Sequence, residues 1–377
     1  MSVVIQKKDL LDAVQKAFPV VPSKGSLLIL SNFKLSYSDS ILEIVATDAD
    51  HSLRVTVGAS GEGPFDITVN ARRFFDAVRV FPEGAITLSL DGMVMLMESA
   101  SQKGFHKEAG ADSSDFPGVP EIKDGVELSI NGFVLREIIQ KTSFAASKDE
   151  TRPVLCGILW ELSSDKTGMV ATDGSRLGHS FVDINLPVEE SLSKIVSRKS
   201  VETLMRITDS KDKDESLKVV IGERYISFST PSFAMVSKLI EGQYPEYDRV
   251  IPKNNPKKIV ADRVAMLETI GRAAILSSQK DRLVKLIFRT GDMEATVKNI
   301  ETGGETKWNM PVEYSGEEHI MGFNGQFFME ILDTIKTEKV RFEVNTQISA
   351  CLIFPEYADE KDKNSEDLFL LMPLRIG

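Results

Sequence analysis

The chain has 377 residues, of which 42% are hydrophobic, and a formal net charge of −11 at pH 7. This length predicts about two to four domains, each able to bury a core, and excludes a disordered or fibrous protein. No run approaches the roughly 20 apolar residues that cross a bilayer, and the amino end lacks a secretory layout, so we expect a soluble cytoplasmic protein.

Most of the sequence predicts short strands. Runs of β-branched and apolar residues alternate with turn residues about every ten positions. Asp91-Gly92 and Gly222-Glu223 lie between consecutive runs and predict hairpin turns. The clearest strand segments are, in chain order, 26–37, 41–47, 85–90, 93–98, 217–221 and 225–229.

Amphipathic helices are predicted at a few places, where apolar residues recur at i, i+3 and i+4. In three of these stretches Asn70, Ser197 and Asn324 stand as N-caps at an offset of 127. The other three stretches start about 125 and 130 residues apart, so two helices in each of three repeats is the simplest account. The predicted helices are 6–18, 70–81, 131–148, 196–207, 261–280 and 324–336.

Further landmarks recur with the same period. Thr47-Asp48 and Thr172-Asp173 each close a strand and stand 125 residues apart. Phe116-Pro117 and Tyr244-Pro245 stand 128 apart in segments rich in Pro, Asp and Gly, where a chain readily leaves one domain for the next. We therefore predict three domains, at 1–120, 121–253 and 254–377.

Two polar runs and the two cysteines predict no chemistry. Residues 209–216 and 359–367 are rich in charge and are expected to form exposed loops. Cys156 and Cys351 lie far apart without a CxxC motif or a Cys/His cluster, so neither a disulfide framework nor a zinc site is indicated. Each cysteine is expected to be a small buried residue.

Charge is unevenly distributed along the chain. The predicted helices hold sixteen basic and nine acidic residues, a net charge of +7, which leaves −18 for the rest of the chain. Helices that face a polyanion would explain this excess, because neutralising phosphates requires local positive charge. Ordinary solvated helix surfaces would also explain it, and no motif for reading bases accompanies it.

No catalytic residue, metal or cofactor is predicted. The sequence lacks a phosphate-binding loop, a dinucleotide motif and HExxH, and its four histidines share no ligand spacing. Asp48, Asp50 and Asp173 could hold a divalent ion for phosphodiester cleavage. Their equivalent places in different repeats favour a shared structural turn. Two alternatives to a non-catalytic DNA-binding protein are a metal-dependent nuclease and a scaffold that binds only proteins.

Five strings in the sequence carry a resemblance to a known family. In order and at the right separations, they are similar to the bacterial sliding clamp, the beta subunit of DNA polymerase III, over essentially the whole chain. The strings are 152–157, 170–177, 239–252, 272–277 and 371–376.

The resemblance implies an α+β fold of three repeated domains, each with two helices packed on antiparallel sheets. Two chains would close head to tail into a ring around duplex DNA. The ring would slide along the DNA and tether the polymerase, without catalysis of its own. Strong phosphate contacts would hold the clamp in one place, and weak contacts alone would let it dissociate. A closed ring stays on the DNA without binding it tightly. The implied partners are double-stranded DNA, a second copy of the chain, the polymerase alpha subunit, the clamp loader and other proteins with a clamp-binding motif, with no membrane and no cofactor.

The resemblance also implies three sets of site residues. Ser175 departs from the enterobacterial His, Pro153-Val154 replaces an aromatic pair, and Lys107 stands where an apolar residue is expected. The dimer interface would include Phe105, Lys107, Ile275 and Leu276, and the cations nearest DNA would be Lys24, Arg72, Arg73, Arg198 and Lys199. A groove for partner peptides would be lined by Arg152, Leu155, Thr172, Gly174, Ser175, Arg176, Leu177, Pro245, Arg249, Val250, Asn324, Phe327, Ile348, Leu370, Met372, Pro373 and Leu374.

Overall fold

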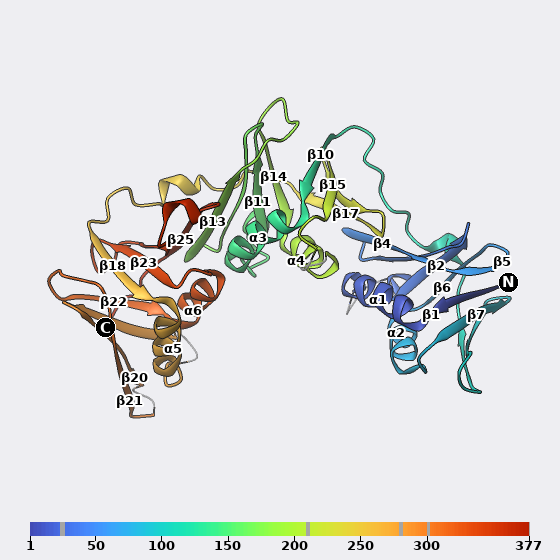
Figure 1. The fold of residues 1–377 in the computed structure, drawn as a ribbon, viewed down its shortest axis with the longest axis horizontal. Helices are drawn as coiled ribbons and strands as arrows, with labels where there is room; N and C mark the ends of the chain where they lie inside the picture. The colour runs from blue at the N-terminus through green and yellow to red at the C-terminus, as the bar shows by residue number, and fades with distance from the viewer. Residues whose placement is uncertain (23–26, 209–211, 279–281, 300–301, 377) are drawn as a thin grey trace. The chain divides into compact units, whose positions relative to one another are not determined.

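The chain forms two compact units in a computed structural model (Figure 1). The first unit comprises Met1–Leu135 and Lys199–Leu239, and the second comprises Arg136–Arg198 and Ile240–Gly377. Each unit contains antiparallel sheets and packed helices. The structure describes residues 1–22, 27–208, 212–278, 282–299 and 302–376.

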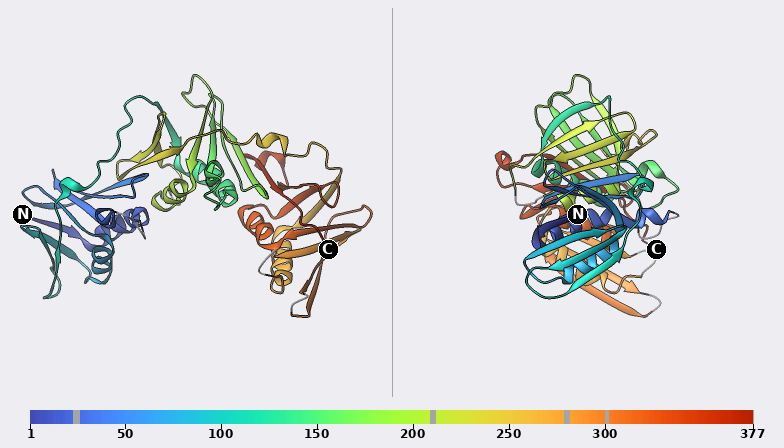
Figure 2. Two further views of the ribbon diagram at one scale, coloured as in Figure 1. Left: turned by 180° about the vertical axis from the view of Figure 1, so that it is seen from behind. Right: turned by 90° about the vertical axis from the view of Figure 1, so that its right-hand side faces the viewer.

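The predicted helices are confirmed. Asn70 caps the second helix by accepting the Arg73 amide at 3.1 Å, and Asn324 caps the last by accepting the Phe327 amide at 3.2 Å. Helix α1 packs against α2, and α5 packs against α6 (Figure 2). The α-helices in the described ranges are α1 (Lys7–Ala17), α2 (Ala71–Val80), α3 (Gly132–Thr142), α4 (Arg198–Ile207), α5 (Arg263–Ala274) and α6 (Gly325–Thr334).

Two helices end earlier than predicted. Helix α3 stops at Thr142, whose hydroxyl donates to the Ile138 carbonyl at 2.8 Å, and a 3-10 turn follows. Helix α5 stops at Ala274, whose carbonyl accepts the Ser277 hydroxyl at 2.7 Å. Hydroxyl side chains compete with the backbone for carbonyls, and apolar spacing does not reveal this competition.

The first unit contains two antiparallel sheets. One has the order β5-β1-β7-β8-β9 and the other the order β10-β15-β16-β17-β4-β3-β2-β6. The strands are β1 (Ser2–Gln6), β2 (Asn32–Ser38), β3 (Ile41–Thr47), β4 (His51–Gly58), β5 (Ser60–Glu62), β6 (Phe65–Asn70), β7 (Ala85–Asp91), β8 (Val94–Ser99), β9 (Phe105–Ala109), β10 (Val126–Asn131), β15 (Ser216–Ile221), β16 (Tyr225–Thr230) and β17 (Phe233–Ile240).

The second unit repeats this plan. Its longer sheet has the order β18-β23-β24-β25-β13-β12-β11-β14, and its shorter sheet has the order β21-β20-β19-β22. The strands are β11 (Gly157–Leu162), β12 (Lys166–Thr172), β13 (Arg176–Asp183), β14 (Leu192–Ser197), β18 (Lys257–Asp262), β19 (Leu283–Arg289), β20 (Asp292–Asn299), β21 (Gly304–Pro311), β22 (His319–Asn324), β23 (Lys339–Val344), β24 (Cys351–Glu356) and β25 (Glu366–Leu371).

The long sheets of the two units match strand for strand. β17 pairs with β4 in the first unit as β25 pairs with β13 in the second, with Ser237 opposite His51 and Leu371 opposite Arg176. Strand pairing therefore continues across the predicted repeat boundaries. This continuity explains why the chain divides into two compact units although its fold is a threefold repeat.

The predicted hairpins are confirmed, and one strand prediction begins too early. Asp91 pairs with Val94 across a turn in which Gly92 has a φ of 59°. Ile221 pairs with Ile226 around the second turn. Within the predicted strand 26–37, residue 26 lies outside the described residues. Residues Leu28–Ser31 form a 3-10 helix before β2.

Burial corrects two further predictions. Cys351 is buried in the core, as expected, but Cys156 is only partly buried. The polar run 359–367 is not wholly an exposed loop, because its end enters β25. There the side chain of Asp367 is 2% exposed and pairs with Lys141 at 2.8 Å. Of the other run, 209–211 lie outside the described residues and 212–214 are exposed.

Candidate functional site

A tight turn between β12 and β13 brings several predicted groove residues together. The Thr172 hydroxyl donates to the Arg176 carbonyl at 2.6 Å. The Asp173 carboxylate accepts the amides of Ser175 and Arg176 at 2.8 and 3.1 Å. Gly174 has a φ of 93°, a conformation that glycine adopts without strain. The turn therefore holds four neighbouring groove positions in a fixed arrangement.

An apolar cluster lies beside this turn. Leu155, Leu177 and Leu370, all predicted groove residues, are 7%, 1% and 3% exposed within it. The Thr172 amide donates to the buried hydroxyl of Tyr244 at 3.1 Å, and burial raises the pKa of this tyrosine. The other buried members are Leu159, Val170, Ile195, Ala350 and Leu352. The cluster would supply an apolar floor for the predicted groove.

Arg176 joins the turn to α6. Its guanidinium pairs with Asp173 at 3.0 Å and with Glu330, and its side chain is 7% exposed. The guanidinium carbon lies 4.0 Å from the centre of the Phe327 ring and 5.4 Å from that of Phe144. Two carboxylates and two rings thus fix one arginine, so the predicted positions 176 and 327 do meet.

The edge of the groove carries more exposed side chains. The Met372 amide donates to the Ser175 carbonyl at 2.8 Å, which anchors the chain while leaving 39% of Met372 exposed. Val250 and Ile348 are more exposed still. The Leu374 amide donates to the Gly322 carbonyl at 2.7 Å, which fixes the segment after Met372. Exposed apolar side chains beside a buried apolar floor suit a ligand with an apolar end.

Five other predicted groove residues are polar or lie at the border. Arg152 pairs with Asp149 at 3.0 Å, and Arg249 pairs with Glu246. Asn324 is committed to capping α6 by its side chain. Pro245 is exposed directly after the buried Tyr244, and Pro373 is partly buried after Met372.

Sequence reasoning missed several contributors to this site. Glu330 and Phe144 hold Arg176 but belong to helical segments whose spacing predicted only core packing. Tyr244 was predicted only as a landmark of the repeat. An aromatic residue directly before a proline was the one sequence signal that could have indicated its role beside the turn. The partners of Arg176 are distant in sequence, so no local pattern could reveal them.

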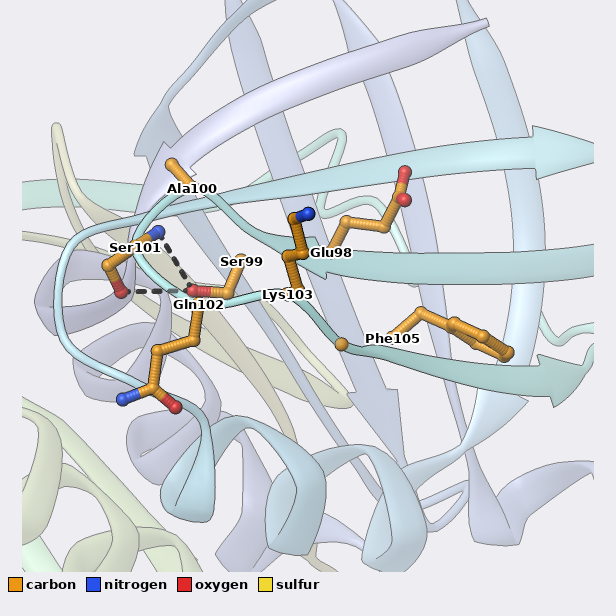
Figure 3. Close-up of a pocket in the computed structure, with 8 residues that line it drawn as sticks. Glu98, Ser99, Ala100, Ser101, Gln102, Lys103 and Phe105 are labelled. Carbon is orange, nitrogen blue, oxygen red and sulfur yellow. Dashed lines mark hydrogen bonds between the residues drawn. The ribbon is translucent and has the colours of Figure 1, made fainter.

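The predicted dimer residues include two prominent exposed apolar side chains. Phe105 at the start of β9 is 70% exposed, and Ile275 directly after α5 is 79% exposed. Leu276 packs partly against the core of the second unit, and Lys107 is exposed on β9. A hollow of about 380 Å³ lies beside Phe105 and is lined by residues 98–105 (Figure 3). The side chains of Phe105 and Ile275 are therefore accessible to a second chain.

The predicted DNA-facing cations differ in their surroundings. Arg73 pairs with the buried carboxylate of Glu108 at 2.7 Å, and Lys199 pairs with Asp48. The side chains of Arg72 and Arg73 are equally exposed, at 65% and 66%, but Arg72 pairs at 2.9 Å with Asp76, which is only partly buried. Lys24 lies outside the described residues. Arg72 is therefore freer to meet a phosphate than Arg73 or Lys199.

Comparison with known proteins decides the family. Residues 1–120, 129–246 and 248–372 match the N-terminal, central and C-terminal domains of the DNA polymerase III beta subunit. The chain belongs to the DNA polymerase III beta subunit family. It is 31% identical to the beta sliding clamps of Proteus mirabilis and Pseudomonas aeruginosa, with 100% of each chain covered.

Solved structures of beta subunits share the fold. A Pseudomonas aeruginosa sliding clamp bound to griselimycin aligns with a TM-score of 0.91 at 30% identity, with 100% of both chains covered. The Thermotoga maritima beta subunit aligns with a TM-score of 0.90 at 26% identity over 100% of both chains. The predicted fold class is confirmed: three domains of helices and antiparallel sheets.

Beta subunits are non-catalytic processivity factors of DNA polymerase III. They form homodimeric rings that bind DNA and polymerase, and this chain has their fold and function. In the described part of this beta subunit, no helix is long and apolar enough to span a membrane, and no group of His, Cys, Asp and Glu could hold a metal ion.

The turn beside the groove recurs in the first unit of this beta subunit. The Thr47 hydroxyl donates to the His51 carbonyl at 2.9 Å, and Asp48 accepts the His51 amide at 2.7 Å. Ala49, at the place of Gly174, also has a positive φ, of 82°. Asp48 and Asp173 therefore both hold structural turns, as their equivalent places in the repeats predicted.

The two copies of the turn differ in their side chains. The sheet registers place His51, Ser52 and Lys238 of the first unit at the positions of Arg176, Leu177 and Met372. The Lys238 amide donates to the Asp50 carbonyl at 2.8 Å, as the Met372 amide does to Ser175. Ser52 and Lys238 are thus polar where Leu177 and Met372 are apolar, whereas His51 and Arg176 are both polar.

Proposed function

We propose that the groove in the second unit receives short apolar-ended peptides of the DNA polymerase III alpha subunit, the clamp loader and other proteins with a clamp-binding motif. The observation that carries this proposal is the buried apolar floor around Leu155, Leu177 and Leu370, bordered by the exposed Met372. Ser175 and Pro153-Val154 lie at its edge, where they would adjust peptide preference. A Met-containing pocket adapts readily to different apolar side chains.

We further propose how two chains close and hold DNA. Phe105 and Lys107 of one chain would face Ile275 and Leu276 of its partner. The exposure of Phe105, Lys107 and Ile275 supports this closed ring. Lys24, Arg72, Arg73, Arg198 and Lys199 would face the DNA, with Arg72 the most available of the pairs described above. Domain boundaries at 1–120, 121–253 and 254–377 and a cytoplasmic location complete the proposal.

Substitution of Met372 tests the groove directly. Met372→Ala removes an apolar side chain worth about 1 to 2 kcal/mol of burial, so the Kd of a fluorescent polymerase tail peptide should rise about tenfold. Met93→Ala is the matched control, because Met93 is an exposed methionine in the β7–β8 hairpin. An unchanged Kd for Met372→Ala, with the dimer intact, would contradict the proposed groove.

A further inference from the structure

A second cavity lies in the first unit, and its lining includes none of the site residues predicted above. It has a volume of about 550 Å³, within the range of small-ligand pockets. One wall is the first connector, defined as residues 117–125, which leads from Phe116 to β10 on the side of the sheet away from α1 (Figure 1). The lining residues are Arg54, Val119, Pro120, Glu121, Ile122, Lys123, Val220, Ser227, Ser229, Ala234 and Val236.

The other wall is the outer face of the long sheet. On β16, Ile226 and Phe228 point into the core, while Ser227 and Ser229 point to the cavity. Alternate residues of a strand face opposite sides, so the small outward side chains leave room beneath the connector. Apolar contact comes from the branched side chains of the connector and sheet, whereas the floor itself is small and polar.

The second unit contains the same construction in a filled form. Its second connector, residues 245–256, follows the buried Tyr244 as the first follows the buried Phe116. The offset of 128 that relates these two anchors places Val119 at the position of Tyr247. The Tyr247 ring lies 6.0 Å from His179, and its hydroxyl donates to Glu161 at 2.6 Å. In the second unit, therefore, a phenol of the chain itself covers the sheet.

The sheet beneath the connector also carries a smaller side chain in the first unit than in the second. Ala234 pairs with Arg54 at the register position that Leu368 and His179 hold in the second unit. Leu368 packs against the apolar cluster together with Tyr247. The first unit thus lacks both the phenol ring and the isobutyl group, and the 550 Å³ cavity is at the place they would fill.

The charges at the cavity favour a ligand that carries a carboxylate next to its aromatic ring. Arg54 and Lys123 both line it, opposed by Glu121. The ion pair of Arg54 with Glu43 is long, at 3.7 Å, and its side chain is 44% exposed. A guanidinium held this loosely can turn to a carboxylate of a ligand, which it binds in a bidentate geometry.

We propose that this cavity binds the aromatic side chain of a partner peptide that carries an acidic residue next to it. The ring occupies the space that Tyr247 fills in the other unit, and the carboxylate meets Arg54 and Lys123. The site is distinct from the peptide groove, because every residue lining it belongs to the first unit.

Methyl NMR of the intact protein tests this inference, with labelled alanine, isoleucine and methionine. The probe is N-acetyl-Asp-Tyr-amide at millimolar concentration, compared with N-acetyl-Asp-Ala-amide and N-acetyl-Asn-Tyr-amide. The Asp-Tyr probe should shift the methyl signals of Ala234 and Ile122, the Asn-Tyr probe should shift them less, and the Asp-Ala probe should leave them in place. The Met372 methyl reports separately on the peptide groove.

Two variants fill the cavity by different means. Val119→Tyr supplies the ring from the connector, and Ala234→Leu supplies the side chain from the sheet, so each should abolish the shift of Ile122. Arg54→Gln should weaken the Asp-Tyr probe to the level of the Asn-Tyr probe. No shift of Ala234 and Ile122 with any probe, equal shifts with all three, or full shifts in both filled variants would overturn the inference.

Discussion

The guanidinium of Arg176 lies against the ring of Phe327, with 4.0 Å between its central carbon and the ring centre. Since it also pairs with Asp173 and Glu330, Arg176 fixes both the turn and the start of α6. Lysine cannot stack and bind two carboxylates in this way. We predict that Arg176→Lys weakens peptide binding about three- to tenfold, by up to about 1.4 kcal/mol.

A peptide titration with a thermal unfolding curve checks this prediction. Arg289→Lys is the control, because Arg289 belongs to no predicted site, has a side chain that is 41% exposed, and pairs with the exposed Glu318 at 2.8 Å. The control should change the Kd little, since an exposed pair contributes little. Equal losses in the two variants would show that Arg176 has no special place in the groove.

The lowered pKa of the Asp48 carboxyl predicts that the free energy of unfolding falls in acid. Burial alone would raise the pKa of its carboxyl, but hydrogen bonds from His51 and Lys199 outweigh burial and hold it well below 3.8. A carboxyl with a lowered folded pKa stabilises the protein above its unfolded pKa, and this contribution is lost as pH falls through the folded value. Asp48→Asn should therefore cost about 1 to 3 kcal/mol at pH 7 and progressively less below about pH 4.

Calorimetric melting of wild type and variant from pH 7 to the acid limit of solubility measures this difference. Asp50→Asn in the same turn is the control, because the Asp50 amide donates to Asp48 while its own side chain is exposed. A constant difference in melting temperature between wild type and Asp48→Asn at every pH would be inconsistent with the assignment.

Ring closure is predicted to depend on Ile275. Placing a charge in a buried apolar contact costs several kcal/mol, so Ile275→Asp should convert the dimer to a monomer of 41.7 kDa. Lys107→Leu should tighten the dimer, because it removes a charge that the contact would desolvate. Light scattering across a dilution series measures both effects. Leu28→Asp places the same charge at an exposed leucine outside the predicted interface and should leave the dimer intact. Dissociation in that variant as well would indicate general destabilisation.

Arg72 and Arg73 should respond differently to neutralisation. Arg72→Gln should weaken DNA binding at low salt and little at high salt, because exposed charges are screened. Arg73→Gln should also lower the melting temperature, because it leaves the buried Glu108 carboxylate with only the longer contact to His106, at 3.5 Å. Lys218→Gln, on an outward position of β15, is the control for net charge. If Arg72→Gln and wild type bind DNA equally at low salt, Arg72 does not contact the DNA.

Much of the fold follows from local sequence patterns. The capping residues Asn70 and Asn324 and the turn at Asp91-Gly92 act through their nearest neighbours, so short-range chemistry predicts them. The equivalent roles of Asp48 and Asp173 followed from the repeat alone. Helix ends were predicted less well, because the hydroxyls of Thr142 and Ser277 compete for carbonyls there.

The candidate site was predictable only in part. Resemblance to the family gave the groove residues, but residues distant in sequence decide how they are held. Glu330 reaches Arg176 across 154 positions and Lys199 reaches Asp48 across 151, and both contacts depend on how strands and helices pack. The burial of Asp367 against Lys141 depends likewise on the pairing of β25 with β13.

Release from cut DNA tests most directly that the chain acts as a closed ring. The protein, placed on a nicked circular plasmid by its clamp loader, should remain bound during gel filtration at moderate salt. It should leave when a restriction enzyme cuts the plasmid once, because retention by a ring depends on the continuity of the DNA. Protein that stays on the linear DNA, or that never remains on the circle, would contradict the account.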